Sequence, residues 1–205
     1  MPGDDIEKLR LHGYVDADWG GDKVRRRSTS GYRIFLADAC IIWASCRQAS
    51  TAGSSTEAEW IASALAVHEI LWIRHILYEL EYFLDDAHLP PKAPKLQESN
   101  AYVHPAADEV PPTYDVNRPP FRPTPLYVDN MGACINSKNP EHRNKLKHID
   151  IAYNITRERC CGPLGSHEID IIKVDTDVNT ADVMTKPLSV ATHIKHTEGL
   201  GLKEI

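Results

Sequence analysis

Residues 11–47 read LHGYVDADWGGDKVRRRSTSGYRIFLADACIIWASCR. Aromatic and β-branched residues gather in three short runs, at 11–18, 32–36 and 41–47, and residues 20–21 and 37–39 separate them as turns. Such runs are typical of strands joined by short connections. The stretch therefore predicts a three-stranded antiparallel meander.

Beyond this stretch the pattern changes to helices alternating with strands. Apolar residues recur every three or four positions from Trp60 to Leu80, which predicts a long helix, and Thr56 with Glu59 has the spacing of a capping box at its start. The later pattern predicts strands at 126–129 and 168–173, and helices at 130–137, 149–159 and 180–186. Three antiparallel strands followed by strand–helix alternation predict an α/β fold, a mixed sheet with helices on its faces.

The composition fits one globular domain. With 205 residues and 42% hydrophobic residues, the chain is long enough for a single core, so we expect one domain over residues 1–205. The formal net charge of -6 excludes a protein that coats nucleic acid by bulk electrostatics, and five cysteines without C-x-x-C spacing indicate reduced thiols rather than disulfides or zinc. Without a run of 18 apolar residues or a secretory start, we expect an intracellular protein outside the membrane.

One segment has a different composition. Ten of the 14 prolines fall between residues 88 and 125, in a stretch with little apolar periodicity. Proline removes backbone donors, and the stretch is longer than an ordinary connection. We therefore expect a proline-rich, disordered insertion at 88–124.

Four acidic residues fall at positions suited to a ligand site. Asp16 lies inside the first predicted strand, where an unpaired carboxylate is unfavourable, while Glu59, Asp129 and Asp182 lie at the ends of elements. Ligand sites in open α/β sheets form at such ends. Converging carboxylates with no basic neighbour in sequence would repel one another unless cations intervened, which suits Mg²⁺ with its oxygen ligands.

Each acid taken alone also has a structural explanation. Glu59 fits a capping residue, and Asp182 fits a favourable charge near a helix start. Spacing alone does not choose between the two interpretations.

Seven segments together carry a family resemblance. They are GYVDADW at 13–19, RSTSGY at 27–32, SSTEAEW at 54–60, YVDN at 127–130, NP at 139–140, KHIDI at 147–151 and ADVMTKP at 181–187. Spanning about residues 11–188, they resemble the ribonuclease H domain of copia-type (Pseudoviridae-like) LTR retrotransposon Pol polyproteins. The resemblance implies an RNase H-like fold, with a five-stranded mixed sheet of three antiparallel and then parallel strands, flanked by helices.

The resemblance also implies an activity and a site. The four metal-binding catalytic acids of the family correspond to Asp16, Glu59, Asp129 and Asp182. With two Mg²⁺ or Mn²⁺ ions they would cleave the RNA strand of an RNA–DNA hybrid during reverse transcription. Glu59 is preferred to Glu57 because residues 58–62 match the Ala-Glu-Leu-x-Ala pattern of the wider ribonuclease H family. Asp18, which lies on the same strand face as Asp16, and Glu57 are interpreted as turn or helix-start charges.

Substrate contacts and partners follow as further expectations. The candidate phosphate-binding residues, which are basic and gathered in two groups near Lys23 and Arg143, are Arg25, Arg26, Arg27, Lys145, Lys147 and His148. Each is also explained as part of a solvated basic loop. The family implies an RNA–DNA hybrid as substrate, a reverse transcriptase domain in the same polyprotein, and a location in the cytoplasm, a virus-like particle or the nucleus. The alternatives are a catalytically degenerate RNase H-fold binding module and a polyprotein remnant.

Overall fold

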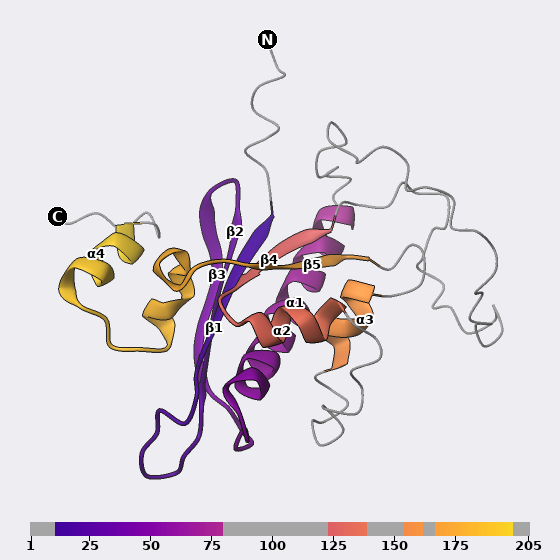
Figure 1. Cartoon of the computed structure of the whole chain (residues 1–205). Helices are drawn as coiled ribbons and strands as arrows, with labels where there is room; N and C mark the ends of the chain where they lie inside the picture. The colour runs from indigo at the N-terminus through magenta and orange to yellow at the C-terminus, as the bar shows by residue number, and fades with distance from the viewer. Residues whose placement is uncertain (1–10, 80–122, 139–153, 162–166, 199–205) are drawn as a thin grey trace.

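The computed structural model describes residues 11–79, 123–138, 154–161 and 167–198 (Figure 1). In chain order the elements of this part are β1 (His12–Asp18), β2 (Thr29–Leu36), β3 (Ala39–Arg47), α1 (Ser55–Glu79), β4 (Thr124–Val128), α2 (Met131–Lys138), α3 (Ile155–Cys161), β5 (Ile169–Lys173), the 3-10 helices η7 (Thr176–Val178) and η8 (Thr180–Met184), and α4 (Val190–Glu198).

The strands form one sheet in the order β3-β2-β1-β4-β5. β2 is antiparallel to both β1 and β3, whereas β4 is parallel to β1 and β5 is parallel to β4. The predicted mixed sheet, with three antiparallel strands and then parallel ones, is confirmed. Because β1 is the central strand, Asp16 in its middle is only 1% exposed.

One face of the sheet packs against α1. Ala58, Ala62 and Ala66, spaced by four residues along the helix, are completely buried, and their small side chains let the helix approach the strands. On the strand side, a Cβ atom at Gly13 would lie only 3.4 Å from Cδ1 of Ile70. Small residues on both surfaces therefore bring α1 close to the sheet.

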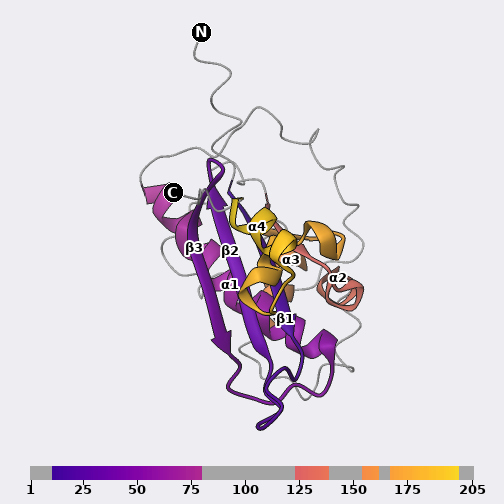
Figure 2. The ribbon, with the colours of Figure 1, turned by 90° about the vertical axis from the view of Figure 1, so that its left-hand side faces the viewer.

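The opposite face of the sheet is covered by the C-terminal elements. Figure 1 shows α4 on one side of the sheet and α1, α2 and α3 on the other, and Figure 2 shows α4 in front of the strands. Arg33 of β2 is fully buried under this layer, and its Nη1 donates to the carbonyl oxygens of Thr180 at 2.9 Å and His196 at 3.2 Å. Arg33 therefore fixes both η8 and α4 to the sheet.

The length and apolarity of α1 reflect its place in the core. Ser55–Leu77 is long and apolar enough to cross a bilayer by length and composition alone, yet most of this segment is buried inside the molecule. Burial against the sheet accounts for the apolar residues.

The start of α1 differs from the predicted capping box. Ser54 Oγ accepts a hydrogen bond from the Glu57 N–H at 3.1 Å, and the Glu57 carboxylate accepts one from the Gly53 N–H at 2.8 Å. The capping pair is therefore Ser54 with Glu57, and the predicted pair of Thr56 with Glu59 is wrong. Both pairs have the same sequence spacing, but the register of α1 turns Glu59 toward β1 instead of toward the end of the helix.

Ser54→Ala should lower the free energy of unfolding by about 1 kcal/mol, because it removes the oxygen that accepts from the first turn of α1. Chemical denaturation measures the change. The matched control is Ser55→Ala, since Ser55 is exposed and a surface substitution usually changes stability by less than about 0.5 kcal/mol. Equal effects of the two substitutions would contradict the assignment of Ser54 as the cap.

The helix predicted at 180–186 is the short 3-10 helix η8. The Asn179 side chain accepts from the Ala181 N–H at 3.2 Å, and Pro187, which has no backbone N–H, follows shortly after the end of η8. In so short a segment 3-10 geometry is common. The helix lies where it is predicted and ends two residues earlier, at Met184.

Other elements also differ from the sequence prediction, and β3 begins at Ala39, inside the predicted turn at 37–39. β2 begins at Thr29, three residues before the predicted start at residue 32. α4 is not predicted by the apolar pattern, because His196 is its one buried residue and the other positions carry mixed polar and apolar side chains.

Two predicted features lie mainly outside the described residues. The first part of the helix predicted at 149–159 is one of them, and the described helix α3 begins at Ile155. The proposed insertion at 88–124 is the other, and β4 begins at its last residue, Thr124, which is buried and accepts a hydrogen bond from Arg74 Nη1 at 2.8 Å.

Candidate metal centre

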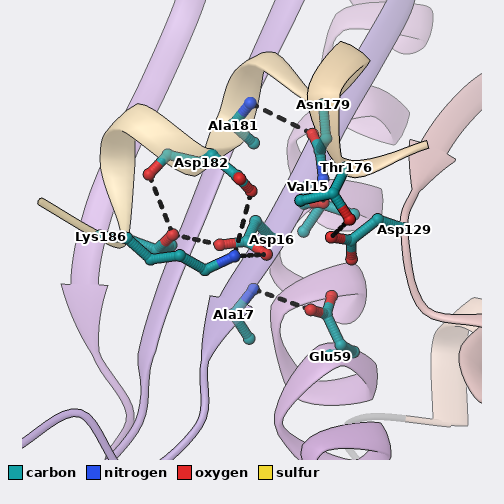
Figure 3. A network of polar contacts seen from close by, with 11 residues as sticks. Val15, Asp16, Ala17, Glu59, Asp129, Thr176, Asn179, Ala181, Asp182 and Lys186 are labelled. Atoms are coloured by element: carbon teal, nitrogen blue, oxygen red, sulfur yellow. Dashed lines mark hydrogen bonds and ion pairs between the residues drawn. The ribbon is translucent and has the colours of Figure 1, made fainter. Parts of the chain in front are cut away.

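The four predicted acids come from four separate elements (Figure 3). Asp16 lies in the middle of β1, Glu59 in the second turn of α1, Asp129 directly after β4, and Asp182 in η8. The first two and Asp182 are buried, while Asp129 is half-buried. The sheet order places β4 beside β1, so that Asp129 emerges next to Asp16.

Three of the acids converge on one point. Asp16, Glu59 and Asp129 each offer a carboxylate oxygen, and these three oxygens lie within 4.8 Å of one another. Oxygen-rich clusters of this kind suit Mg²⁺ or Mn²⁺. The arrangement could hold a metal ion.

Glu59 has one oxygen without a partner inside this cluster. Its Oε1 accepts from the Ala17 N–H at 3.1 Å, whereas its Oε2 is buried and has no hydrogen-bond partner among the described residues. Burial, followed by the negative charges of Asp16 and Asp129, raises the pKa of Glu59 to about 9. A buried, unpaired carboxylate oxygen beside two other acids fits a divalent cation, which would favour the charged form.

Asp129 is oriented by a residue that follows β5. Thr176 Oγ1 in η7 donates to Asp129 Oδ2 at 3.1 Å. The Val174 N–H also donates to the Val128 carbonyl oxygen at 2.8 Å, which keeps the end of β5 beside the end of β4. Parallel pairing of these strands therefore fixes the third acid.

Asp182 joins the cluster through a lysine. Lys186 Nζ lies 3.2 Å from Asp16 Oδ1 and 3.2 Å from Asp182 Oδ1. Burial and the charge of Asp16 raise the pKa of Asp182 to about 6, against the lowering effect of Lys186. Burial lowers the pKa of the Lys186 ammonium, but the two carboxylates outweigh burial and raise it above its ordinary value.

The sequence analysis missed Thr185 and Lys186. Thr185 Oγ1 donates a hydrogen bond to Asp16 Oδ2 and Lys186 contacts the other oxygen of Asp16, so that both oxygens of this acid have partners. The statement that no basic residue neighbours the acids in sequence is wrong, because Lys186 lies four residues after Asp182. An acid and a base at this spacing commonly face each other in helical segments, and this spacing is the signal that could have found Lys186.

Gly31 explains how the segment carrying Asp182 reaches β1. It pairs with Asp16 across the β1–β2 ladder, and a Cβ atom at this position would lie 2.6 Å from Thr185 Cγ2 and 2.7 Å from Met184 Cβ. A larger residue would push η8 away from the sheet. The glycine therefore makes room for Asp182 and its neighbours above Asp16.

Asn179 holds the same segment from the other end. It is completely buried, and its Nδ2 donates to the Val15 carbonyl oxygen at 2.9 Å. Because Val15 precedes Asp16, this bond aligns the start of η8 with the centre of β1 (Figure 3).

The two alternative acids have structural positions. Glu57 caps α1, as described above, and the Asp18 carboxylate lies against the turn at Gly21, where a Cβ atom would overlap it. Both positions agree with the interpretation of these acids as helix-start and turn charges.

The predicted basic residues divide between described and undescribed parts. Arg25, Arg26 and Arg27 lie in the loop after β1, which projects beyond the sheet in Figure 1; the first two are exposed. Within the loop, Asp22 Oδ1 accepts from the N–H groups of Arg25 at 3.1 Å and Val24 at 3.0 Å, and these bonds lower the Asp22 pKa. Lys145, Lys147 and His148 lie outside the described residues.

The sheet order and the acids at its centre define an RNase H-like α/β domain with a candidate metal site. The relatives of this chain are retrovirus-related Pol polyproteins from plant transposons. The chain is 31% identical over 197 residues, 96% of its length, to the polyprotein from transposon RE1 of Arabidopsis thaliana. It is 29% identical over 176 residues, 86% of its length, to the polyprotein from transposon TNT 1-94 of Nicotiana tabacum.

The similarity covers a small part of these polyproteins. The chain spans 11% of the RE1 polyprotein and 10% of the TNT 1-94 polyprotein. A stretch of 64 residues, 31% of the chain, is also 48% identical to secreted RxLR effector protein 161 of Plasmopara viticola, covering 45% of that protein. No protein-family model and no solved structure matches the chain.

Proposed function

We propose that this domain is a ribonuclease H that cleaves the RNA strand of RNA–DNA hybrids with two Mg²⁺ or Mn²⁺ ions, during reverse transcription of a copia-type retrotransposon. The observation that carries the proposal is the convergence of Asp16, Glu59 and Asp129, from β1, α1 and the end of β4, within 4.8 Å. The relatives named as retrovirus-related Pol polyproteins support this context.

The four acids have different roles in this proposal. Asp16, Glu59 and Asp129 would hold one ion, while Asp16 and Asp182 would hold the other. When bound, such ions supply the charge that activates a water and stabilises the leaving 3′ oxygen of the scissile phosphate. The protein groups set the positions of the carboxylates.

Neighbouring groups fix the orientation of the acids. The Ala17 N–H holds one oxygen of Glu59, and Thr176 holds one oxygen of Asp129, leaving the other oxygen of each acid for the ion. Hydrogen bonds of this kind to metal-binding side chains commonly raise metal affinity about 10- to 100-fold. The site is therefore organised before the ion binds.

The substrate would be recognised by shape and charge. A hybrid is read through its backbone and its ribose 2′-hydroxyl groups, with little sequence specificity. Arg25 and Arg26, exposed in the loop that continues from the strand of Asp16, are suited to phosphate contacts. We propose the same role for Arg27, Lys145, Lys147 and His148. We also propose that the domain works beside a reverse transcriptase domain of the same polyprotein, inside the cell.

A catalytically degenerate binding module is the second candidate. The Lys186 ammonium already neutralises part of the negative charge around Asp16 and Asp182, so that this half of the cluster is compensated without a metal ion. A domain that binds without cutting has the same fold, and only an activity measurement distinguishes the two.

The chain should cleave a labelled RNA–DNA hybrid in Mg²⁺ and leave RNA duplex, DNA duplex and single-stranded RNA intact. Cleavage should require Mg²⁺ because the carboxylates lack a complete set of counter-charges until divalent ions bind. Gel analysis of the products measures cleavage, with 3′-hydroxyl and 5′-phosphate ends expected and EDTA as the control. Hybrid binding without cleavage in either Mg²⁺ or Mn²⁺ would support the degenerate module instead.

A further inference from the structure

The two halves of the acidic cluster are filled differently. On the side of Glu59, a buried carboxylate oxygen has no partner among the residues that the structure describes. On the side of Asp182, Lys186 Nζ lies 3.2 Å from one oxygen of Asp182 and 3.2 Å from one oxygen of Asp16. One half therefore lacks a cation and the other half contains one.

The lysine contacts the same pair of carboxylates that a second ion would need. Thr185 Oγ1 donates to the remaining oxygen of Asp16, so that the side chains of Thr185 and Lys186 together contact both oxygens of this acid. The Asp16 and Asp182 side chains are 1% and 8% exposed, so that water provides little compensation for their charge. An ammonium at this position has a strong electrostatic reason to remain there in the metal-free protein.

The lysine side chain nevertheless has a route into solvent. Its side chain is 33% exposed and has four methylene groups, so that rotation of the stem can carry the ammonium into solvent without moving η8. A phosphate group of a bound nucleic acid would offer the displaced ammonium another anionic partner.

We propose that Lys186 is an internal cation that competes with a second divalent ion for Asp16 and Asp182. The domain then binds one ion firmly at Asp16, Glu59 and Asp129, and a second ion only when the ammonium leaves. In this scheme Lys186 acts through its contacts with Asp16 and Asp182. The inference rests on the proposed metal centre and adds an order of binding to it.

The test is a titration of the full chain with Mn²⁺ in the absence of nucleic acid. Calorimetry and the electron paramagnetic resonance signal of free Mn²⁺ both measure binding during the titration. The unchanged chain should bind one ion, with a second bound at least about tenfold more weakly, because the second must displace a charge already in place. Lys186→Met should strengthen the second binding event about tenfold or more and leave the first nearly unchanged.

Two further variants separate charge from structure. Lys186→Arg keeps a positive charge and should keep the weak second site, whereas Lys186→Gln removes the charge but keeps hydrogen-bond donors and should behave like the methionine variant. Lys195→Met is the matched control, because Lys195 is exposed and donates to the Asp177 carbonyl oxygen instead of to the cluster. It should leave both binding events unchanged.

The outcomes distinguish this inference from the proposed function. The role of Lys186 would be overturned if the unchanged chain bound two ions with equal affinity. It would also be overturned if Lys186→Gln bound the second ion as weakly as the unchanged chain does. Either result would leave the proposed metal centre standing. No ion bound by the unchanged chain or by any variant would overturn both. If Lys186→Met does not fold, the comparison with Lys186→Gln decides.

Discussion

Asp129→Asn should fold normally and lose hybrid cleavage by about 10³-fold or more, because even one preorganised group that stabilises charge contributes about 10²- to 10³-fold. Asp129 is half-buried and lies outside the helices and strands, so that an amide of the same shape can keep the Thr176 hydrogen bond. The substitution removes one negative charge from the cluster while leaving the core intact. Single-turnover cleavage at saturating Mg²⁺ measures the loss, and the melting temperature checks the fold.

The matched control for this substitution is Asp175→Asn. Asp175 precedes η7, close in sequence to the partner of Asp129, but its side chain is 92% exposed and contacts Lys173 at 3.9 Å. It should retain cleavage within about twofold of the unchanged chain, because an exposed ion pair contributes little. Comparable cleavage by Asp129→Asn and Asp175→Asn would remove Asp129 from the metal centre.

The strand pattern was sufficient to predict the sheet. Runs of aromatic and β-branched residues separated by turn residues predict three strands in 11–47, and β1 to β3 lie there, with β2 and β3 beginning three and two residues before their runs. The long apolar period of α1 is equally informative, because a core helix needs one wide apolar face. These signals are local in sequence, and the tertiary structure agrees with them.

The details around η8 depend on contacts that local pattern does not contain. Gly31 in β2 makes room for Thr185, which is far away in the sequence. Arg33 donates to the carbonyl oxygen of Thr180, which lies 147 residues later in the chain. A short segment takes 3-10 or α geometry according to such contacts more than to its own propensity. The contact of Lys186 with Asp182 has a local signal in their four-residue spacing, but its contact with Asp16, 170 residues away, has none.

The register of α1 shows the same limit on a smaller scale. Thr56 with Glu59 and Ser54 with Glu57 both satisfy the spacing of a capping box, so that sequence spacing cannot choose. The choice is made by the position of β1, whose Ala17 N–H meets Glu59 and leaves Glu57 to cap the helix. Capping-box spacing alone therefore does not separate the candidate metal-binding acid Glu59 from the capping acid Glu57; the family pattern at 58–62 and the tertiary contacts do.

Glu59→Gln should stabilise the metal-free protein at alkaline pH and abolish its stabilisation by Mg²⁺. The folded protein holds the Glu59 proton with a pKa of about 9, while the ordinary value for the unfolded chain is 4.5. Between these values the folded state binds more protons than the unfolded state, so the free energy of unfolding falls as pH rises and is lowest above about pH 9. A neutral amide at this position removes that part of the pH dependence.

Thermal unfolding in EDTA at about pH 5 and pH 9 measures this effect, and each 1 kcal/mol corresponds to about 2–4 °C for a domain of this size. Glu59→Gln should melt at a higher temperature than the unchanged chain at the alkaline pH, with a smaller difference at the acidic pH. In Mg²⁺ the order should reverse, because the ion replaces the proton on Glu59 and stabilises only the chain that retains the carboxylate.

Glu57→Gln is the matched control, because it changes the same residue type two positions earlier on the same helix. Its side-chain oxygen can still accept from the Gly53 N–H, so it should lose less than about 1 kcal/mol at both pH values and retain both Mg²⁺ stabilisation and hybrid cleavage. Glu59→Gln should lose cleavage completely. Retention of cleavage by Glu59→Gln together with its loss in Glu57→Gln would show that the capping acid and the metal-binding acid of α1 have been exchanged in this assignment.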